Sequence, residues 1–144
     1  MVLKHDVVET SKMSMEYDGS LIDTERNAAT DLDNGRLAVR DGATYKYPAA
    51  KTATELFLIT TPEKTYTNVG LNEFYNKEGK KVRAVRVMLG DQFGTTAATG
   101  DVGDILMVDT QGKLIANDAG TVEFEVVAKR MVSGYPGLVV ERIK

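Results

Sequence analysis

Short apolar runs separated by glycine-bearing turns make up the last third of the chain, residues 100–144. Two of these runs, Ile105 to Val108 and Leu114 to Ala116, are joined by a tight turn and predict a hairpin. Apolar and acidic residues alternate over 122–126, as in a half-exposed strand, and a last strand is expected at 138–143. The pattern is typical of a small antiparallel β-barrel or sandwich.

The middle of the chain continues this pattern of strands and turns. Asn34 and Gly35 form a strong turn signal, and the alternating residues 36–40 after them predict a strand. Leu56 to Ile59 is a continuous apolar run, typical of a strand that is buried on both faces. The apolar alternation changes phase within residues 81–89, which predicts a β-bulge. In total we expect about seven or eight strands and an all-β fold.

Residues 1–33 are mostly polar and lack a continuous apolar stripe. Such a segment gains little from burial in its own domain, so it predicts an extended N-terminal arm, followed by a single β-barrel-like domain at 34–144. Within the arm, Met13, Met15 and Tyr17 alternate with polar residues as in a short strand. We therefore expect these three side chains to contact a partner by adding a strand to an exposed sheet edge.

Size and charge limit the classes of function. The 144 residues suit one domain, and a content of 42% hydrophobic residues is enough for one core. The net charge of -3 is opposite to the basic footprint of a dedicated nucleic-acid binder. The chain shows neither a signal peptide nor an apolar stretch long enough to span a membrane. We expect no nucleic-acid and no membrane partner.

The residue types that most often perform catalysis or bind metals are scarce. The chain has no Cys and no Trp, and His5, beside Asp6, is its single histidine. It also lacks the phosphate-binding, dinucleotide-binding and serine-nucleophile motifs. These absences predict no catalytic residue, no cofactor and no metal site, and they favour a non-enzymatic building or binding element.

Two groups of acidic residues leave alternatives open. Loop carboxylates among glycines could bind Ca²⁺, although Asp and Gly are also the usual turn residues. The residues of this first group are Asp91, Asp101, Asp104 and Asp109. Paired acids could also act on a glycosidic bond, and the candidates for that chemistry are Asp31, Asp33 and Asp41. For both groups we favour ordinary turn and loop positions.

Arg83 and Arg86, beside Lys80 and Lys81, form the one basic cluster of the sequence. The predicted bulge would let both arginines point outward from the same face. They are candidate contacts for an acidic partner surface, and the alternative is a solvated strand face.

Three short stretches near the C-terminus resemble a known class of protein. Gly90-Asp91-Gln92-Phe93 is followed by Val102-Gly103-Asp104-Ile105-Leu106 and then by Gln111-Gly112-Lys113-Leu114. This progression resembles the small β-barrel capsid decoration proteins of tailed phages, also called cement or head-stabilisation proteins, over about residues 82–144. The polar residues 1–33 would fit the arm that such proteins lay on the capsid shell.

The resemblance implies a virion structural protein that binds the outer surface of an assembled capsid. Its partner would be the major capsid protein, it could form a homo-oligomer (dimer or trimer) on the capsid, and it would be present in the host cytoplasm during assembly. Another phage structural part, a tail-tube or head-fibre base module, is the alternative, and a cell-wall glycan hydrolase is a third hypothesis. The expected partner-binding residues are Met13, Met15, Tyr17, Arg83 and Arg86.

Overall fold

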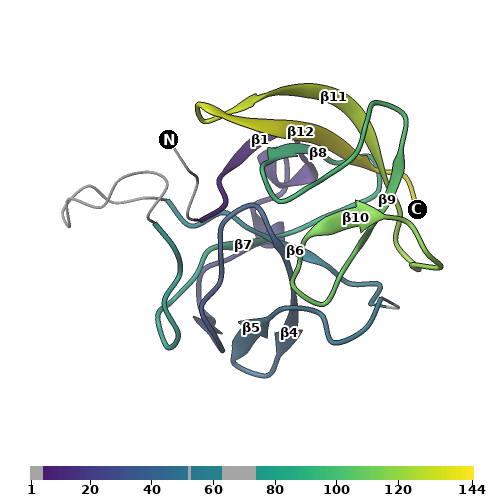
Figure 1. Cartoon of the computed structure of the whole chain (residues 1–144). Coiled ribbons are helices and arrows are strands. Elements are labelled where there is room, and N and C mark those ends of the chain that lie inside the picture. The colour runs from purple at the N-terminus through teal and green to yellow at the C-terminus, as the bar shows by residue number, and fades with distance from the viewer. Residues whose placement is uncertain (1–4, 52, 63–73) are drawn as a thin grey trace.

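The computed structural model describes residues 5–51, 53–62 and 74–144, and these form two six-stranded sheets packed face to face (Figure 1). From edge to edge, the first sheet contains β1 (Val8–Lys12), β8 (Gln92–Thr95), β12 (Tyr135–Arg142), β11 (Phe124–Val132), β9 (Ile105–Val108) and β10 (Leu114–Ala116). The second contains β2 (Ile22–Asp23), β7 (Ala84–Arg86), β6 (Phe57–Ile59), β4 (Leu37–Asp41), β5 (Thr44–Lys46) and β3 (Asn27–Ala28).

Neighbouring strands are antiparallel except β3 and β5, which are parallel. In each sheet the strand order is open, so the fold is a sandwich and not a closed barrel. The prediction of an all-β protein is therefore confirmed. Two single turns of 3-10 helix, η1 (Ser14–Glu16) and η2 (Gly19–Leu21), complete the elements of the described residues.

The predicted C-terminal hairpins are present. Strands β9 and β10 pair as expected, with Leu114 opposite Val108. The last hairpin is longer than its apolar pattern suggested, because β11 and β12 remain paired up to the Ser133–Gly134 turn. Both turn residues have positive φ, 48° at Ser133 and 89° at Gly134, as a tight hairpin turn requires.

The main core lies between the two sheets. The aromatic rings of Phe93 and Phe124 pack edge to face at its centre, with centroids 6.0 Å apart. The core side chains of the first sheet come mainly from β8, β9, β11 and β12. The second sheet contributes the side chains of Leu37, Leu58 and Val85. Because the side chains come from both sheets, neither sheet can bury its apolar face without the other.

A second, smaller cluster lies on the opposite face of the second sheet. Phe57, Ile59 and Ala84 belong to it, whereas their neighbours Leu58 and Val85 enter the main core. The pairing of β6 with β7 runs without a register shift. The bulge predicted within residues 81–89 is therefore wrong for β7, and the change of apolar phase arises because this strand is buried on both faces.

The N-terminal residues that the structure describes, 5–33, lie within the sandwich. Strand β1 pairs with β8, with Val8 opposite Thr95, while β2 and β3 form the two edges of the second sheet. Val7 and Met13 are 1% and 2% exposed. Residues 5–33 therefore do not form the extended arm that the sequence predicted. A domain boundary at residue 33 would separate β2 and β3 from the other strands of the second sheet. Isolated apolar residues of this segment are buried at separate points, so the segment packs against the domain without a continuous apolar stripe.

The predicted turn at Asn34 and Gly35 is confirmed. It precedes β4 of the second sheet and is hydrogen-bonded to β8 of the first sheet. Gly35 has a φ of 82°, and a Cβ atom there would lie 2.7 Å from the Val7 carbonyl oxygen. The Thr95 hydroxyl of the first sheet donates a 2.7 Å hydrogen bond to the Gly35 carbonyl. Only glycine allows both the backbone conformation and this close approach.

We expect Met13→Ala to destabilise the protein by about 2–5 kcal/mol, because the methionine side chain is almost fully buried in the main core. Tyr17→Ala is the matched control, since Tyr17 is 93% exposed and its loss should change the free energy of unfolding by no more than about 0.5 kcal/mol. Urea denaturation of the two variants measures both values. Equal stability of Met13→Ala and the unchanged protein would contradict the placement of the N-terminal segment in the core.

Candidate functional site

Exposed apolar side chains gather beside η1. Tyr17 is 93% exposed and Leu89 68%, and both line a hollow of about 360 Å³ whose rim includes Lys12 and Glu16. Met88, next to Leu89, is also exposed. We call Tyr17, Met88 and Leu89 the apolar patch. A polar rim around exposed apolar groups is typical of a protein-binding surface.

A buried carboxylate fixes the base of the apolar patch. Asp91 is 3% exposed and accepts three hydrogen bonds of 2.8 Å, from the Ser14 amide, the Ser14 hydroxyl and the Met88 amide. These bonds join η1 to the turn that precedes β8. Of the two interpretations of Asp91, the structure therefore supports a turn residue that binds backbone amides. The same bonds hold together the two backbone segments that carry the patch.

The three predicted contacts of the N-terminal segment do not share a face. Met13 is buried, Met15 is half-buried against the main core, and Tyr17 alone is exposed. The alternation expected of a strand fails because residues 14–16 form the 3-10 turn η1. Met13 is thus corrected from a partner contact to a core residue. Leu89, which the sequence pattern placed on a strand, joins Tyr17 in the patch instead.

Arg83 and Arg86 lie on opposite faces of the second sheet. Because the pairing of β7 contains no bulge, side chains three residues apart point to opposite sides. The Arg86 guanidinium pairs with the Glu55 carboxylate and lies 5.4 Å from the centre of the Phe57 ring, on the face of the smaller cluster. Arg83 lines a polar pocket on the face toward the first sheet. The expected joint surface of the two arginines is therefore wrong.

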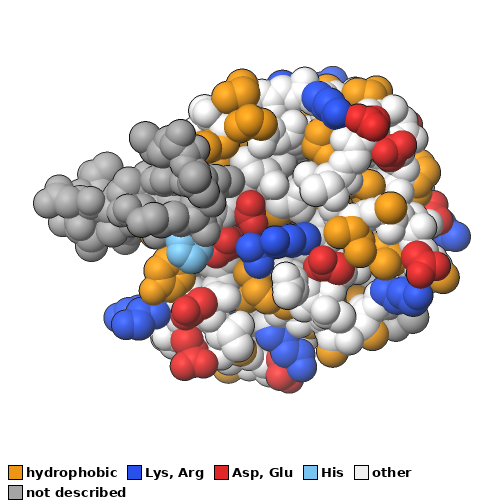
Figure 2. Space-filling model, in the orientation of Figure 1, with side chains coloured by type: hydrophobic (Ala, Val, Ile, Leu, Met, Phe, Trp, Pro, Cys, Tyr) orange, Lys and Arg blue, Asp and Glu red, His pale blue; other side chains and the backbone are white. Residues whose placement is uncertain are grey.

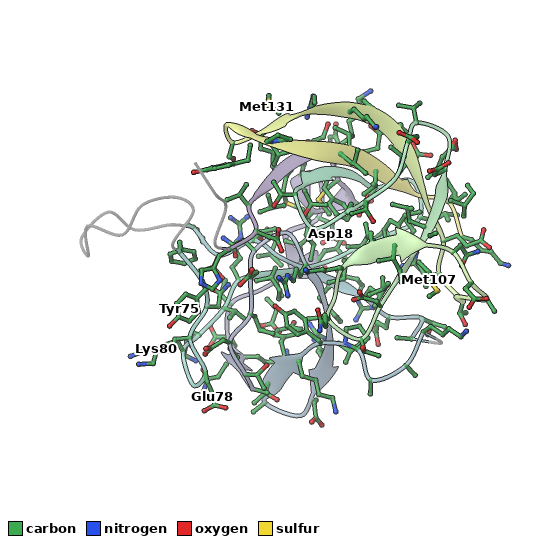
Figure 3. All side chains as sticks on the ribbon, viewed as in Figure 1. Asp18, Tyr75, Glu78, Lys80, Met107 and Met131 are labelled. Atoms are coloured by element: carbon green, nitrogen blue, oxygen red, sulfur yellow. The ribbon has the colours of Figure 1, made fainter. Side chains whose placement is uncertain are left out.

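A cluster of charged side chains surrounds the single histidine, shown in pale blue among acidic and basic side chains in Figure 2. His5 Nδ1 lies 2.8 Å from Asp33 Oδ1, and Arg36 binds Asp6 Oδ2 at 2.8 Å and Asp33 Oδ2 at 3.2 Å. The His5 ring also stacks on Tyr75, which Figure 3 labels, with centroids 4.5 Å apart. These contacts tie the start of the described chain to the turn before β4.

A second polar cluster is centred on Asp23 of β2. Asp23 is 8% exposed and accepts a 2.6 Å hydrogen bond from the Tyr45 hydroxyl, and it also pairs with Arg26 and Arg40. Burial alone would raise the pKa of Asp23, but the hydrogen bonds from Tyr45, the Glu25 amide and Arg26 outweigh it and lower the pKa to about 2. Burial, together with the bond to Asp23, raises the pKa of Tyr45 to about 12.

The sequence alone did not reveal either cluster. Asp33 and Arg36 are close in the chain, but their partners His5 and Asp6 are about thirty residues away, and Tyr45 is far from Asp23. No local spacing signals such pairs. Only the packing of separate strands brings them together.

The acidic residues considered for glycoside chemistry have separate partners. Asp33 belongs to the histidine cluster, Asp41 pairs with Lys46 at 3.4 Å, and Asp31 accepts a hydrogen bond from the Glu78 amide. In the group considered for calcium, Asp104 and Asp109 bind backbone amides of their own turns. Over the described ranges, no set of three or more histidine, cysteine or acidic side chains is placed to hold a metal ion.

The comparisons with known proteins identify no relative. No protein-family model, no curated protein and no solved structure matches the chain. Among the described residues, no helix has the length and apolar character needed to cross a membrane.

We expect acid to remove the stabilisation that Asp23 provides. Its pKa of about 2 in the folded protein is below the value of about 3.9 of an unfolded chain, so its contribution is complete above pH 4 and is lost as the pH falls toward 2. This loss amounts to about 2 kcal/mol. In Asp23→Asn, unfolding free energies measured by urea titration should be lower at pH 7 and should fall less between pH 4 and pH 2.

The control for this experiment is Asp41→Asn, since Asp41 is an exposed partner of Lys46 and contributes little. The Asp41→Asn variant should keep the acid profile of the unchanged protein. If Asp23→Asn keeps that profile as well, another carboxylate carries the acid sensitivity and the assignment to Asp23 is wrong.

Proposed function

We propose that this protein is a structural protein of a tailed-phage virion that binds the outer surface of the assembled capsid and stabilises it. The observation that carries the proposal is the apolar patch, Tyr17, Met88 and Leu89, on a base fixed by Asp91. The resemblance of residues 82–144 to capsid decoration proteins supplies the class of partner, the major capsid protein. Binding would use the patch and would require no chemical reaction.

The energetics of the apolar patch suit a repeated contact of moderate strength. Covering a large apolar side chain removes it from water and contributes about 1.5–3 kcal/mol, and tyrosine is among the residues that most often dominate interfaces. Because Asp91 already holds η1 against the turn before β8, binding has little backbone left to order. One such contact is weak, but many symmetry-related copies act together on one shell.

The consequence for a capsid follows from mass action. Packaged DNA repels itself and pushes the shell outward, so a protein that binds only the intact shell lowers the free energy of that state relative to a disrupted one. Bridging neighbouring subunits would add contact area where the shell opens. The function therefore depends on binding and not on turnover.

We expect Tyr17→Ala and Leu89→Ser each to weaken binding to capsids at least tenfold, or about 1.4 kcal/mol per site. The assay is co-sedimentation of purified protein with expanded shells of the major capsid protein encoded in the same genome. Val102→Ser is the matched control, because Val102 is 62% exposed but lies outside the patch. All three variants should unfold at the same temperature as the unchanged protein, since none of these side chains is buried.

Three outcomes would contradict the proposal. If the unchanged protein does not sediment with expanded shells, the capsid is not its partner. If it instead polymerises when concentrated, as light scattering would detect, it belongs to a self-assembling part such as a tail tube. Equal loss of binding in the Val102→Ser control would show that the apolar patch is not the contact surface.

A further inference from the structure

A polar pocket opens between the sheets where β1 faces the ends of β6 and β7. Its volume is about 340 Å³, and none of the described residues that line it is acidic. The walls come from both sheets and the loops beside them: Val8, Thr10, Asn34, Thr60, Thr61, Pro62, Arg83 and Ser133. The pocket shares no lining residue with the hollow of the apolar patch.

Arg83 differs from the other arginines because its side chain has no partner among the residues that the structure describes. In the described chain every other arginine binds a carboxylate or backbone carbonyl groups, as Arg86 does with Glu55 and Arg142 with the Val87 carbonyl. The backbone of Arg83 is bonded, since its amide donates to the Thr61 hydroxyl oxygen at 3.0 Å. Arg83 is half-buried, and no acceptor among the described residues pairs with the five N–H donors of its guanidinium.

A buried hydroxyl in the same pocket also lacks a partner. Thr60 is 8% exposed, and its hydroxyl is the one buried side-chain polar atom of the described residues that makes no hydrogen bond. The neighbouring Thr61 hydroxyl accepts a bond from the Arg83 amide and keeps its own proton to donate. Within the described part of the chain, the pocket therefore contains one positive charge without a partner and two hydroxyl donors without acceptors.

Two hydrogen bonds hold the backbone of Thr61 beside Asn34. Asn34, 3% exposed, accepts from the Thr61 amide at 3.1 Å and donates to the Thr61 carbonyl at 2.8 Å. The acidic residue that contacts the pocket wall is Glu9, and it is already engaged by the Ser133 amide at 2.6 Å and by Arg130 at 4.0 Å. Glu9 therefore does not neutralise Arg83, and no acidic side chain in the described ranges lines the pocket.

We propose that this pocket is a binding site for a carboxylate, which Arg83 holds through paired N–H···O bonds and to which the Thr60 and Thr61 hydroxyls donate. A carboxylate supplies one negative charge for the one unpaired positive charge and enough oxygen lone pairs for all three groups. Two sources present this chemistry, a small organic acid and a glutamate or aspartate side chain of a partner protein. The site is independent of the apolar patch and of the proposed capsid contact.

The test is a titration of the full-length protein followed by the NMR shifts of its backbone amides. The probes are sodium glutarate, the capped peptide acetyl-Gly-Glu-Gly-amide and its glutamine analogue, at constant ionic strength. We expect saturable shifts at residues 10, 60, 61, 83 and 133 with glutarate and the glutamate peptide, and none with the glutamine peptide. Tighter binding of the peptide than of glutarate indicates a partner side chain, and the reverse indicates a small acid.

Three variants and one matched control locate the site. Arg83→Gln should weaken glutarate binding at least tenfold, while Arg83→Lys and Thr60→Val should weaken it by smaller factors. Arg86→Gln is the control, because it removes the same charge three residues further along the chain, on the opposite face of the sheet. Thr60→Val should also unfold at the same or a higher temperature without ligand, since it replaces an unpaired buried hydroxyl with a methyl group.

Several results would overturn the proposal. Shifts that do not saturate, or an equal loss of binding in Arg86→Gln, would mean that glutarate acts only as a general counterion. Tighter binding of inorganic phosphate than of glutarate would exclude a carboxylate site. A markedly lower unfolding temperature of Thr60→Val without ligand would mean that the hydroxyl already has a partner in the folded protein.

Discussion

The packing of the two sheets against each other is the contact on which the rest of the structure depends. The strands of the second sheet are short, and β2 and β3 contain only two residues each. Such strands are not stable alone. They are held because Leu58 and Val85 enter the same core as Phe93 and Phe124 of the first sheet. The two sheets therefore depend on each other, because each covers the apolar face of the other.

This packing also creates the two surfaces to which we assign binding. The N-terminal segment crosses from one sheet to the other, anchored in the core by Val7 and Met13. Between and beyond these anchors it presents Thr10 to the polar pocket and Tyr17 to the apolar patch. A segment that looked like a free arm is therefore the wall of one site and part of the other. Loss of its docking would remove both surfaces at once.

Most buried charged side chains stabilise the fold by joining separate segments, whereas we assign the Arg83 guanidinium to ligand binding. Asp91 and Asp23 are almost fully buried, and each accepts several hydrogen bonds that join separate segments. Arg36 joins Asp6 and Asp33 in the same way. The Arg83 guanidinium differs, because it pairs with no described residue, and for this reason we assign a ligand to its pocket.

The sequence by itself determined the all-β class, the β9–β10 hairpin and the Asn34–Gly35 turn. These features depend on local alternation and turn chemistry, which neighbouring residues express without help from the rest of the chain. Tertiary structure alone decided that Met13 is buried, that Arg83 and Arg86 face opposite sides, and that Tyr17 meets Leu89. The physical reason is that burial and neighbours depend on contacts between distant segments. A strand covered on both faces, such as β7, has no alternation from which its orientation could be read.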